Sequence, residues 1–175
     1  MGTALTVRDL IGERAIFRRE QAVGLSTTAY LLAKVCIYAV FAIVQSSIVT
    51  AIAVLGKGGP TQGSVSFQPP TAELFVVMGA TTVTAAMVGL ALSAMAKSAE
   101  QIMPLLVVAV MSQLVFSGGM IPVTDRLVLD QLSWITPARW GFAASASTVD
   151  LIHLVPGPLT PKDALWEHTT KAWYF

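Results

Sequence analysis

The residues able to do chemistry are few and scattered. The two histidines, His153 and His168, stand apart in the last part of the chain, and Cys36 is the single cysteine. A serine nucleophile needs a base beside it, and the three longest uncharged stretches contain no histidine, aspartate or glutamate. One cysteine excludes a disulfide scaffold and a zinc site built on several thiolates. The sequence therefore disfavours a membrane-embedded enzyme and predicts no catalytic residues and no metal site.

A glycine-rich stretch at residues 56–60, Gly-Lys-Gly-Gly-Pro, invites comparison with a phosphate-binding loop. That motif requires a glycine five residues before its Gly-Lys pair and a serine or threonine directly after it. Ala51 and Gly58 occupy these two positions. The sequence therefore predicts no nucleotide site here and no cofactor in this chain.

The composition indicates the class of protein. Of the 175 residues, 54% are apolar and 12% are charged, about half the charged share of a typical soluble domain. So few charged side chains argue against a soluble domain, and so many apolar ones exclude a disordered chain. The net charge of +1 argues against nucleic acid as a partner, because such proteins concentrate positive charge. A membrane protein remains.

Three uncharged stretches are long enough to cross a membrane. They are residues 35–55, 74–96 and 102–124, and about 20 apolar residues span the roughly 30 Å of hydrocarbon. Because backbone polar groups have no partner in lipid, each stretch is predicted to be helical. Glycines and a proline interrupt the far end of the third stretch, which limits its helix to residues 103–117, about 22 Å long. The Gly-Gly-Met-Ile-Pro run is expected to turn within the membrane or at its surface.

Basic residues near the ends of the stretches predict the orientation of the chain. Only Lys57 lies in the loop after the first stretch and only Lys97 in the turn after the second. The segment before the first stretch is richer in them and contains Arg8, Arg14, Arg18, Arg19 and Lys34. We therefore expect the N-terminus in the cytoplasm and the tail from residue 125 outside.

The N-terminal segment, residues 5–23, carries seven charged side chains and an apolar face at helical spacing. No acidic residue in it has a basic residue three or four positions away, the spacing that stabilises a surface helix. The charges are therefore available to groups outside the helix. Two interpretations remain open. The segment docks onto a cytoplasmic partner, or it is a solvated helix whose arginines lie over anionic lipid.

Polar side chains inside the predicted spans are expected to face other helices or a cavity, because they are costly against lipid. Interhelical hydrogen bonding is the simpler interpretation for the serines and threonines, and Gln45 and Gln113 are better candidates for a substrate path. No span contains an acidic residue, which argues against a proton-coupled transporter. Small residues in the second span recur every four positions and predict a packing stripe. They are Thr81, Ala85, Gly89 and Ser93.

Two segments resemble parts of one known family. Residues 13–20, Glu-Arg-Ala-Ile-Phe-Arg-Arg-Glu, are followed by Tyr-Leu-Leu-Ala-Lys at 30–34. Residues 116–122, Phe-Ser-Gly-Gly-Met-Ile-Pro, are followed by Trp-Ile-Thr-Pro-Ala-Arg-Trp-Gly-Phe at 134–142. The first pair resembles the cytoplasmic loop and following span of G-subfamily ABC exporter permeases with the type-2, White-like fold, and is also similar to bacterial, actinobacterial-type members. The second pair resembles the end of the fifth span and the outer re-entrant helices.

The resemblance implies a role for each matching position. Coupling to a nucleotide-binding domain is implied for Glu13, Arg14, Phe17, Arg18, Arg19 and Glu20, which favours the docking interpretation. A substrate cavity and plug are predicted at Gln45, Val110, Gln113, Leu114, Met120 and Ile121. Gly119 departs from the apolar plug of the relatives, so Met120 with Ile121 is the expected substitute. The outer cap is predicted at Pro137, Arg139, Trp140, Gly141 and Phe142.

The expected fold is an all-α membrane protein with a partial type-2 ABC exporter permease fold. It has three transmembrane helices, an N-terminal cytoplasmic amphipathic helix, and outer re-entrant and cap helices. The predicted segments are a cytoplasmic coupling region at 1–27, a transmembrane helix at 28–56, an outer loop at 57–72, a transmembrane helix at 73–96, an inner turn at 97–101, a short transmembrane helix at 102–118, and an outer re-entrant and cap region at 119–175.

The function that the resemblance implies is the permease portion of an ATP-binding cassette exporter in the plasma (inner) membrane, moving an amphipathic or lipid-like substrate. The chain itself would not be an enzyme, since ATP and Mg would bind a nucleotide-binding ATPase domain outside it. A homodimer or a second permease half, and membrane lipid, are the other expected partners. The family's first two spans and last span are missing, which predicts a fragment, a truncated frame or part of a split gene. The alternative is a non-transporting membrane protein, either a truncated remnant or a regulatory subunit.

Overall fold

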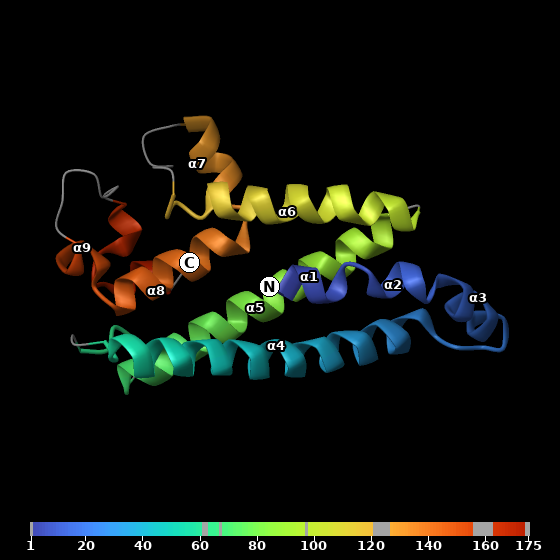
Figure 1. Ribbon diagram of the computed structural model, residues 1–175, viewed down its shortest axis with the longest axis horizontal. Helices are drawn as coiled ribbons and strands as arrows, with labels where there is room; N and C mark the ends of the chain where they lie inside the picture. Colours follow the sequence, from blue (N-terminus) through green and yellow to red (C-terminus); the bar gives the residue numbers. More distant parts are fainter. Residues whose placement is uncertain are drawn as a thin grey trace. The chain divides into compact units, whose positions relative to one another are not determined.

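A computed structural model describes residues 2–60, 63–66, 68–96, 98–120, 127–155 and 163–173. Every regular element in these residues is helical (Figure 1). The long helices are α4 (Thr27–Lys57), α5 (Pro70–Met95) and α6 (Ile102–Phe116). The short elements are α1 (Gly2–Thr6), α2 (Asp9–Gly12), α3 (Arg14–Ala22), η1 (Ala99–Gln101), α7 (Leu127–Ser133), α8 (Pro137–Thr148), α9 (Leu151–Leu154), η2 (Ala164–Trp166) and η3 (Thr170–Ala172).

Three of the described helices are long and apolar enough to cross a membrane, namely α4, α5 and the stretch formed by η1 with α6. The predicted all-α fold with three transmembrane helices is thereby confirmed. Helix α5 begins at Pro70, a few residues earlier than the sequence predicted, because proline suits the first turn of a helix. Glu73 also lies in that first turn, where a carboxylate is favoured by the helix dipole.

Helix α6 is short for a full crossing. Its 15 residues extend about 22 Å, against the roughly 30 Å of hydrocarbon in a bilayer. The helix ends at Phe116, and two residues later Gly118 has φ +82°, which glycine adopts without a steric cost. The Ser117 hydroxyl donates to the carbonyl of Leu114 at 2.8 Å and accepts from the N–H of Gly119 at 3.3 Å. These bonds satisfy backbone groups at the helix end.

The N-terminal segment is helical, as predicted, but it forms three short helices instead of one. Helix α2 ends at Gly12, and glycine costs about 1 kcal/mol more than alanine inside a helix. Glu13 follows with φ −94° and ψ 1°, outside the helical region, and α3 begins at the next residue. The break turns Glu13 towards α4, where its carboxylate finds a cationic partner that the segment itself lacks.

Contacts divide the chain into two compact units. They are Met1–Gln45 with Thr82–Val110, and Ser46–Thr81 with Met111–Phe175. In the first unit Val7, Ala96 and Ile102 form a buried apolar cluster, against which leucines of α5 and α6 pack. This cluster holds the end of α1 against the start of α6.

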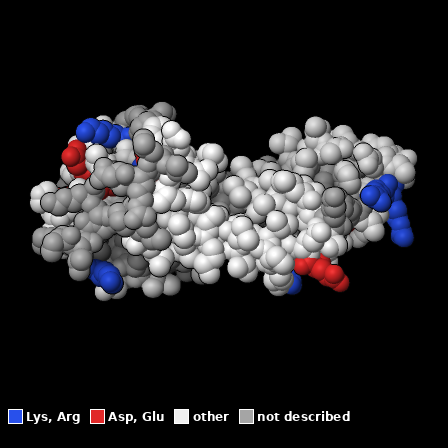
Figure 2. Space-filling view, turned by 90° about the horizontal axis from the view of Figure 1, so that it is seen from above, with Lys and Arg blue, Asp and Glu red and all other residues white. Residues whose placement is uncertain are grey.

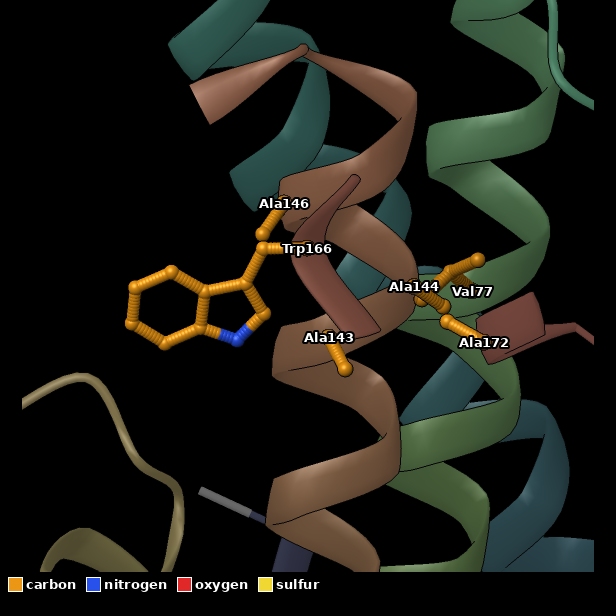
Figure 3. Close-up of a cluster of buried hydrophobic side chains, with 6 residues drawn as sticks. All are labelled: Val77, Ala143, Ala144, Ala146, Trp166 and Ala172. Carbon is orange, nitrogen blue, oxygen red and sulfur yellow. The ribbon is translucent and has the colours of Figure 1, made fainter. Parts of the chain in front are cut away.

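The core of the second unit is built on small side chains of α8. Alanines let this helix lie close to α5, and Trp166 of η2 is 3% exposed beside them. An aromatic side chain of this size buries roughly 150–250 Å² and so dominates the core. Figure 3 shows the buried members, which are Val77, Ala143, Ala144, Ala146, Trp166 and Ala172.

The predicted packing stripe of α5 is in contact with neighbouring helices in both units. In the first unit Gly89 faces α1 so closely that an added Cβ would lie 2.7 Å from the carbonyl of Thr3. In the second unit Thr81 faces Gly141 of α8, where an added Cβ would lie 2.9 Å from the Thr81 Cβ. The small residues therefore allow close helix approach, as the spacing predicted.

The outer surfaces of the long helices are strongly apolar. Only 17% of the most apolar window of α4 and 6% of that of η1 with α6 is buried. Val40 and Phe41 of α4, for example, are 62% and 60% exposed. Much of the described surface in Figure 2 is uncharged. A surface of this kind is stable against lipid or other apolar helices, not against water.

Candidate functional site

Helix α3 presents arginines to the surroundings. Residues 14–22 contain no glycine or proline, and most are good helix formers. The helix is followed by Gly24 at φ +109°, whose N–H bonds to the carbonyl of Gln21 at 3.1 Å, a glycine ending typical of helices. Arg18 and Arg19 are exposed.

Two acidic side chains of the segment, Asp9 and Glu13, bond to α4. The Lys34 Nζ lies 2.8 Å from Asp9 Oδ2 and 2.8 Å from Glu13 Oε1. Tyr30, one turn earlier on α4, donates its hydroxyl to Glu13 Oε2 at 2.7 Å. The side chains of Lys34 and Asp9 are only 15% and 14% exposed, so water screens their attraction less than at an open surface. We call Asp9, Glu13, Tyr30 and Lys34 the Lys34 cluster.

The Lys34 cluster determines the protonation of Glu13. The hydrogen bond from Lys34, followed by that from Tyr30, lowers the pKa of the Glu13 carboxyl below its ordinary value of 4.5. Glu13 is therefore ionised at neutral pH. The ring of Phe17 lies 4.8 Å from that of Tyr30, centroid to centroid, with a tilt of 40°. This ring contact adds an apolar attachment between α3 and α4.

The structure divides the predicted coupling residues into two groups. Glu13 and Phe17 contact α4 within the chain and are half-buried. The exposed group is Arg18, Arg19 and Glu20. The side chain of Arg14 lies outside the described residues. Because the acids near the start of the segment are bonded to Lys34, the exposed arginines are the charges best placed to bind an acidic surface outside the chain.

A cavity of about 220 Å³ lies in the first unit, among α2, α3, α4 and α5. It is lined almost entirely by apolar atoms. Its lining residues are Leu10, Phe17, Thr27, Tyr30, Leu31, Ser93 and Ala94. None of the residues predicted for the substrate cavity lines it, so the two regions are different.

The predicted substrate-cavity residues lie along α4, α6 and the turn after α6. The half-buried ones are Gln45, Val110 and Gln113. Leu114 and Met120 are 45% and 73% exposed. Ile121 lies outside the described residues. The exposure of Leu114 and Met120 leaves their side chains open to neighbouring helices, lipid or a substrate.

The predicted outer-cap residues come together in the second unit. Pro137 is the first residue of α8, where its fixed φ suits the first turn. Trp140 donates its indole N–H to the carbonyl of Trp134 at 3.0 Å, and the two rings meet edge to face with centroids 5.4 Å apart. Phe142 meets Trp166 in the same way at 5.3 Å.

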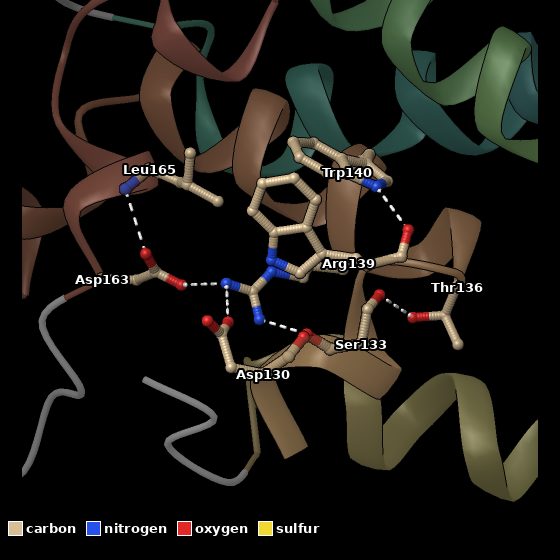
Figure 4. A network of polar contacts seen from close by, with 8 residues as sticks. Asp130, Ser133, Thr136, Arg139, Trp140, Asp163 and Leu165 are labelled. Atoms are coloured by element: carbon tan, nitrogen blue, oxygen red, sulfur yellow. Dashed lines mark hydrogen bonds and ion pairs between the residues drawn. The ribbon is translucent and has the colours of Figure 1, made fainter. Parts of the chain in front are cut away.

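Arg139 joins three elements of this cap. Its Nη2 lies 2.8 Å from Asp130 Oδ1 on α7 and 3.5 Å from Asp163 Oδ2 beside η2, and its Nη1 donates to the Ser133 hydroxyl (Figure 4). The Arg139 and Asp163 side chains are 5% and 8% exposed. Since a guanidinium presents several donors in a fixed plane, one arginine can hold α7, α8 and η2 together.

The sequence alone did not identify several of these contacts. The sequence uses Lys34 for the orientation and for the family resemblance and predicts no partner for it, although Tyr30 precedes it by four residues and shares its helix face. From the sequence Glu73 marks only the start of another span, yet its buried carboxylate accepts the N–H groups of Val65 and Ser66 at 3.0 and 3.1 Å. Asp163 gave no signal, because its arginine partner lies 24 positions away in the sequence.

Comparison with known proteins places these features in a family. The family described as ABC-2 type transporter matches residues 3–149 of the chain. A protein from Mycobacterium tuberculosis, named ABC transporter ATP-binding/permease protein, is 77% identical over 175 residues, which is 100% of this chain and 20% of that protein. The chain thus spans about a fifth of the curated relative it matches. No solved structure matches the chain significantly.

Proposed function

The chain belongs to the ABC-2 type transporter family, and we propose that it forms the transmembrane permease portion of an ATP-driven exporter. The name of the 77% identical relative includes both an ATP-binding and a permease activity. This supports an ATP-binding partner whose ATP and Mg are held outside the region that this chain matches. Within the family, the resemblance of residues 13–34 and 116–142 supports a G-subfamily, White-like permease of the actinobacterial type.

The observation that carries the proposal is the outward face of α3. Arg18 and Arg19 are exposed, while Asp9 and Glu13 are bonded to Lys34 within the chain. The free charge of α3 is therefore mainly positive and suited to an acidic surface. We assign that surface to the nucleotide-binding ATPase domain, whose ATP-driven closure would push on α3.

The substrate class follows from the character of the spans. The described surfaces of α4 and α6 are largely uncharged and exposed, and Gln45 and Gln113 supply polar groups among apolar ones. This combination suits an amphipathic or lipid-like molecule better than an ion, which requires charged or carbonyl ligands along its path. A homodimer or a second permease half would supply the opposite wall, since only 6% of the apolar window of η1 with α6 is buried.

The orientation in this proposal places the N-terminus in the cytoplasm and the C-terminal tail outside the plasma membrane. Arg8 and the arginines of α3 precede the first span, which supports a cytoplasmic position. This position is also the one at which a cytoplasmic ATPase domain can reach Arg18 and Arg19. The Arg139 network then lies on the outer side.

The test of the proposal is co-purification. The chain is produced in membranes together with the ATP-binding part of the Mycobacterium tuberculosis relative, and the complex is isolated from detergent. The unchanged chain is expected to retain the ATP-binding part through purification. The Arg18→Glu/Arg19→Glu variant is expected to lose it. The Lys57→Glu variant reverses an exposed charge at the other end of α4 and is expected to retain the partner. Persistence of binding after reversal of both arginines would overturn the docking role of α3.

A further inference from the structure

We infer that Lys34 is a positioning residue that makes α2, α3 and the N-terminal part of α4 move as one rigid body. A force applied to the exposed arginines of α3 would then reach the first span directly. The origin of that force in an ATPase domain rests on the proposed function, whereas the rigid connection itself rests on the contacts around Lys34.

One ammonium group serves two carboxylates from different elements. Asp9 belongs to α2 and Glu13 precedes α3, and both lie 2.8 Å from the Lys34 Nζ. Lysine suits this position because its three donors radiate from a single point. The bond from Tyr30 to the other oxygen of Glu13 fixes the direction of that carboxylate.

Helix α3 has little else to hold it. Nine residues are too few for a stable isolated helix, so its position depends on tertiary contacts. Ile16 of α3 is 56% exposed, and Val23, directly after the helix, is 90% exposed, so only part of the apolar surface here is covered. Among the described side chains, the Lys34 cluster and the ring of Phe17 against Tyr30 attach α3 to α4.

Removal of Lys34 would leave two carboxylates close together without the cation that binds both. Asp9 and Glu13 are four residues apart, and like charges at that spacing repel each other. Helix α1 is held separately against α5 by the Thr6 hydroxyl, which donates to the carbonyl of Ala86 at 2.8 Å. Without Lys34, Glu13 keeps the bond from Tyr30 and Asp9 keeps the bond from the Tyr38 hydroxyl, but the group that joins the two carboxylates is lost. We therefore expect α2 and α3 to sample a wider range of positions relative to α4 while α1 stays in place.

The connection can be measured as a distance between spin labels. Cys36, which is exposed, is replaced by serine, and labels are placed at the exposed positions Ile16 of α3 and Leu32 of α4. In the otherwise unchanged chain we expect one narrow distance distribution. Lys34→Gln is expected to broaden it, and Lys34→Arg to keep it narrow because arginine can also bond two carboxylates. A Lys57→Gln variant is the matched control and should change nothing.

A second arm separates this inference from the proposed function. In complex with the ATP-binding part of the relative, addition of ATP should leave the Ile16–Leu32 distance unchanged. Lys34→Gln keeps Arg18 and Arg19, so it should still retain the partner although its distance distribution is broad. The Arg18→Glu/Arg19→Glu variant should show the opposite behaviour, with a narrow distribution and no partner.

The outcomes are distinct. A Lys34→Gln distribution as narrow as that of the unchanged chain, or an ATP-dependent shift in the unchanged chain, overturns the rigid connection. Failure of the unchanged chain to retain the ATP-binding part, with the distributions behaving as expected, overturns the proposed function and leaves the rigid connection standing.

Discussion

The Thr6 hydroxyl donates a hydrogen bond of 2.8 Å to the backbone carbonyl of Ala86, and this bond holds α1 directly against α5. Such an approach is possible because Gly89, one turn further along α5, has no side chain. A Cβ added there would lie 2.7 Å from the Thr3 carbonyl and would also meet the Thr6 hydroxyl, so backbone must move.

Gly89→Ala is therefore expected to destabilise the first unit. Overpacking of a close contact typically costs about 1–3 kcal/mol, and thermal unfolding in detergent measures it. Gly56→Ala is the matched control in α4, because an added Cβ there meets nothing within 4 Å. Equal midpoint temperatures of thermal unfolding for the two variants would show that α1 does not lie against α5 as described.

Arg139→Met should loosen the packing of α7, α8 and η2 in the second unit. The change leaves Asp163, which is 8% exposed, without the cation that compensates its burial, and loss of one partner of a buried pair costs about 3–5 kcal/mol. Lys171→Met breaks an exposed pair with Glu167 and should cost less than about 1 kcal/mol. Denaturant unfolding followed by tryptophan fluorescence compares the two. A similar loss in the free energy of unfolding for both variants would show that the Arg139 ion pairs do not stabilise this unit.

Glu73→Gln should release the loop before α5. The buried carboxylate accepts the N–H groups of Val65 and Ser66, one on each oxygen, and an amide can replace only one of these acceptors. Faster proteolysis at residues 63–66 is expected. The exposed Glu100→Gln variant serves as control and should be cleaved at the original rate. Unchanged cleavage in Glu73→Gln would show that these bonds do not order the loop.

The attachment of α3 to α4 should weaken at acid pH and stay constant near neutral pH. The hydrogen bond from Lys34, followed by that from Tyr30, lowers the pKa of Glu13 in the folded chain. The ionised Glu13 therefore stabilises the fold at pH values above its ordinary pKa of 4.5, and this stabilisation is lost as the pH falls through the lower pKa of the folded chain. Hydrogen-exchange protection of α3, corrected for intrinsic rates, should be constant between about pH 6 and 8 and fall only in the acid range. Glu13→Gln should remove most of this acid dependence. A decline already at neutral pH would assign the effect to another group.

The three spans and the turn after α6 could be predicted because they depend on composition and local geometry. Lipid requires long uncharged helices, and Gly118 marks the end of α6 wherever the rest of the chain lies. The packing stripe through Gly89 was predictable for the same reason, since its spacing is set by the helix repeat.

The ion pairs could not be predicted in this way. Asp9 and Glu13 had no partner within their own segment, and the sequence offered docking or a solvated helix as explanations for these charges. Lys34 binds them only after the chain breaks at Gly12 and folds back onto α4. Arg139 and Asp163 are likewise joined by tertiary structure, because no helical or turn spacing relates them.

In the proposed function, α3 contacts an ATP-binding domain through its exposed arginines. The most direct measurement is photo-crosslinking with a light-activated residue at position 19, compared with one at Leu55, which is 86% exposed at the far end of α4. The ATP-binding part of the Mycobacterium tuberculosis relative is present in both samples. We expect a covalent adduct from position 19 and none from position 55. An adduct from position 55, or none from position 19 while the two proteins co-purify, would contradict the proposed contact.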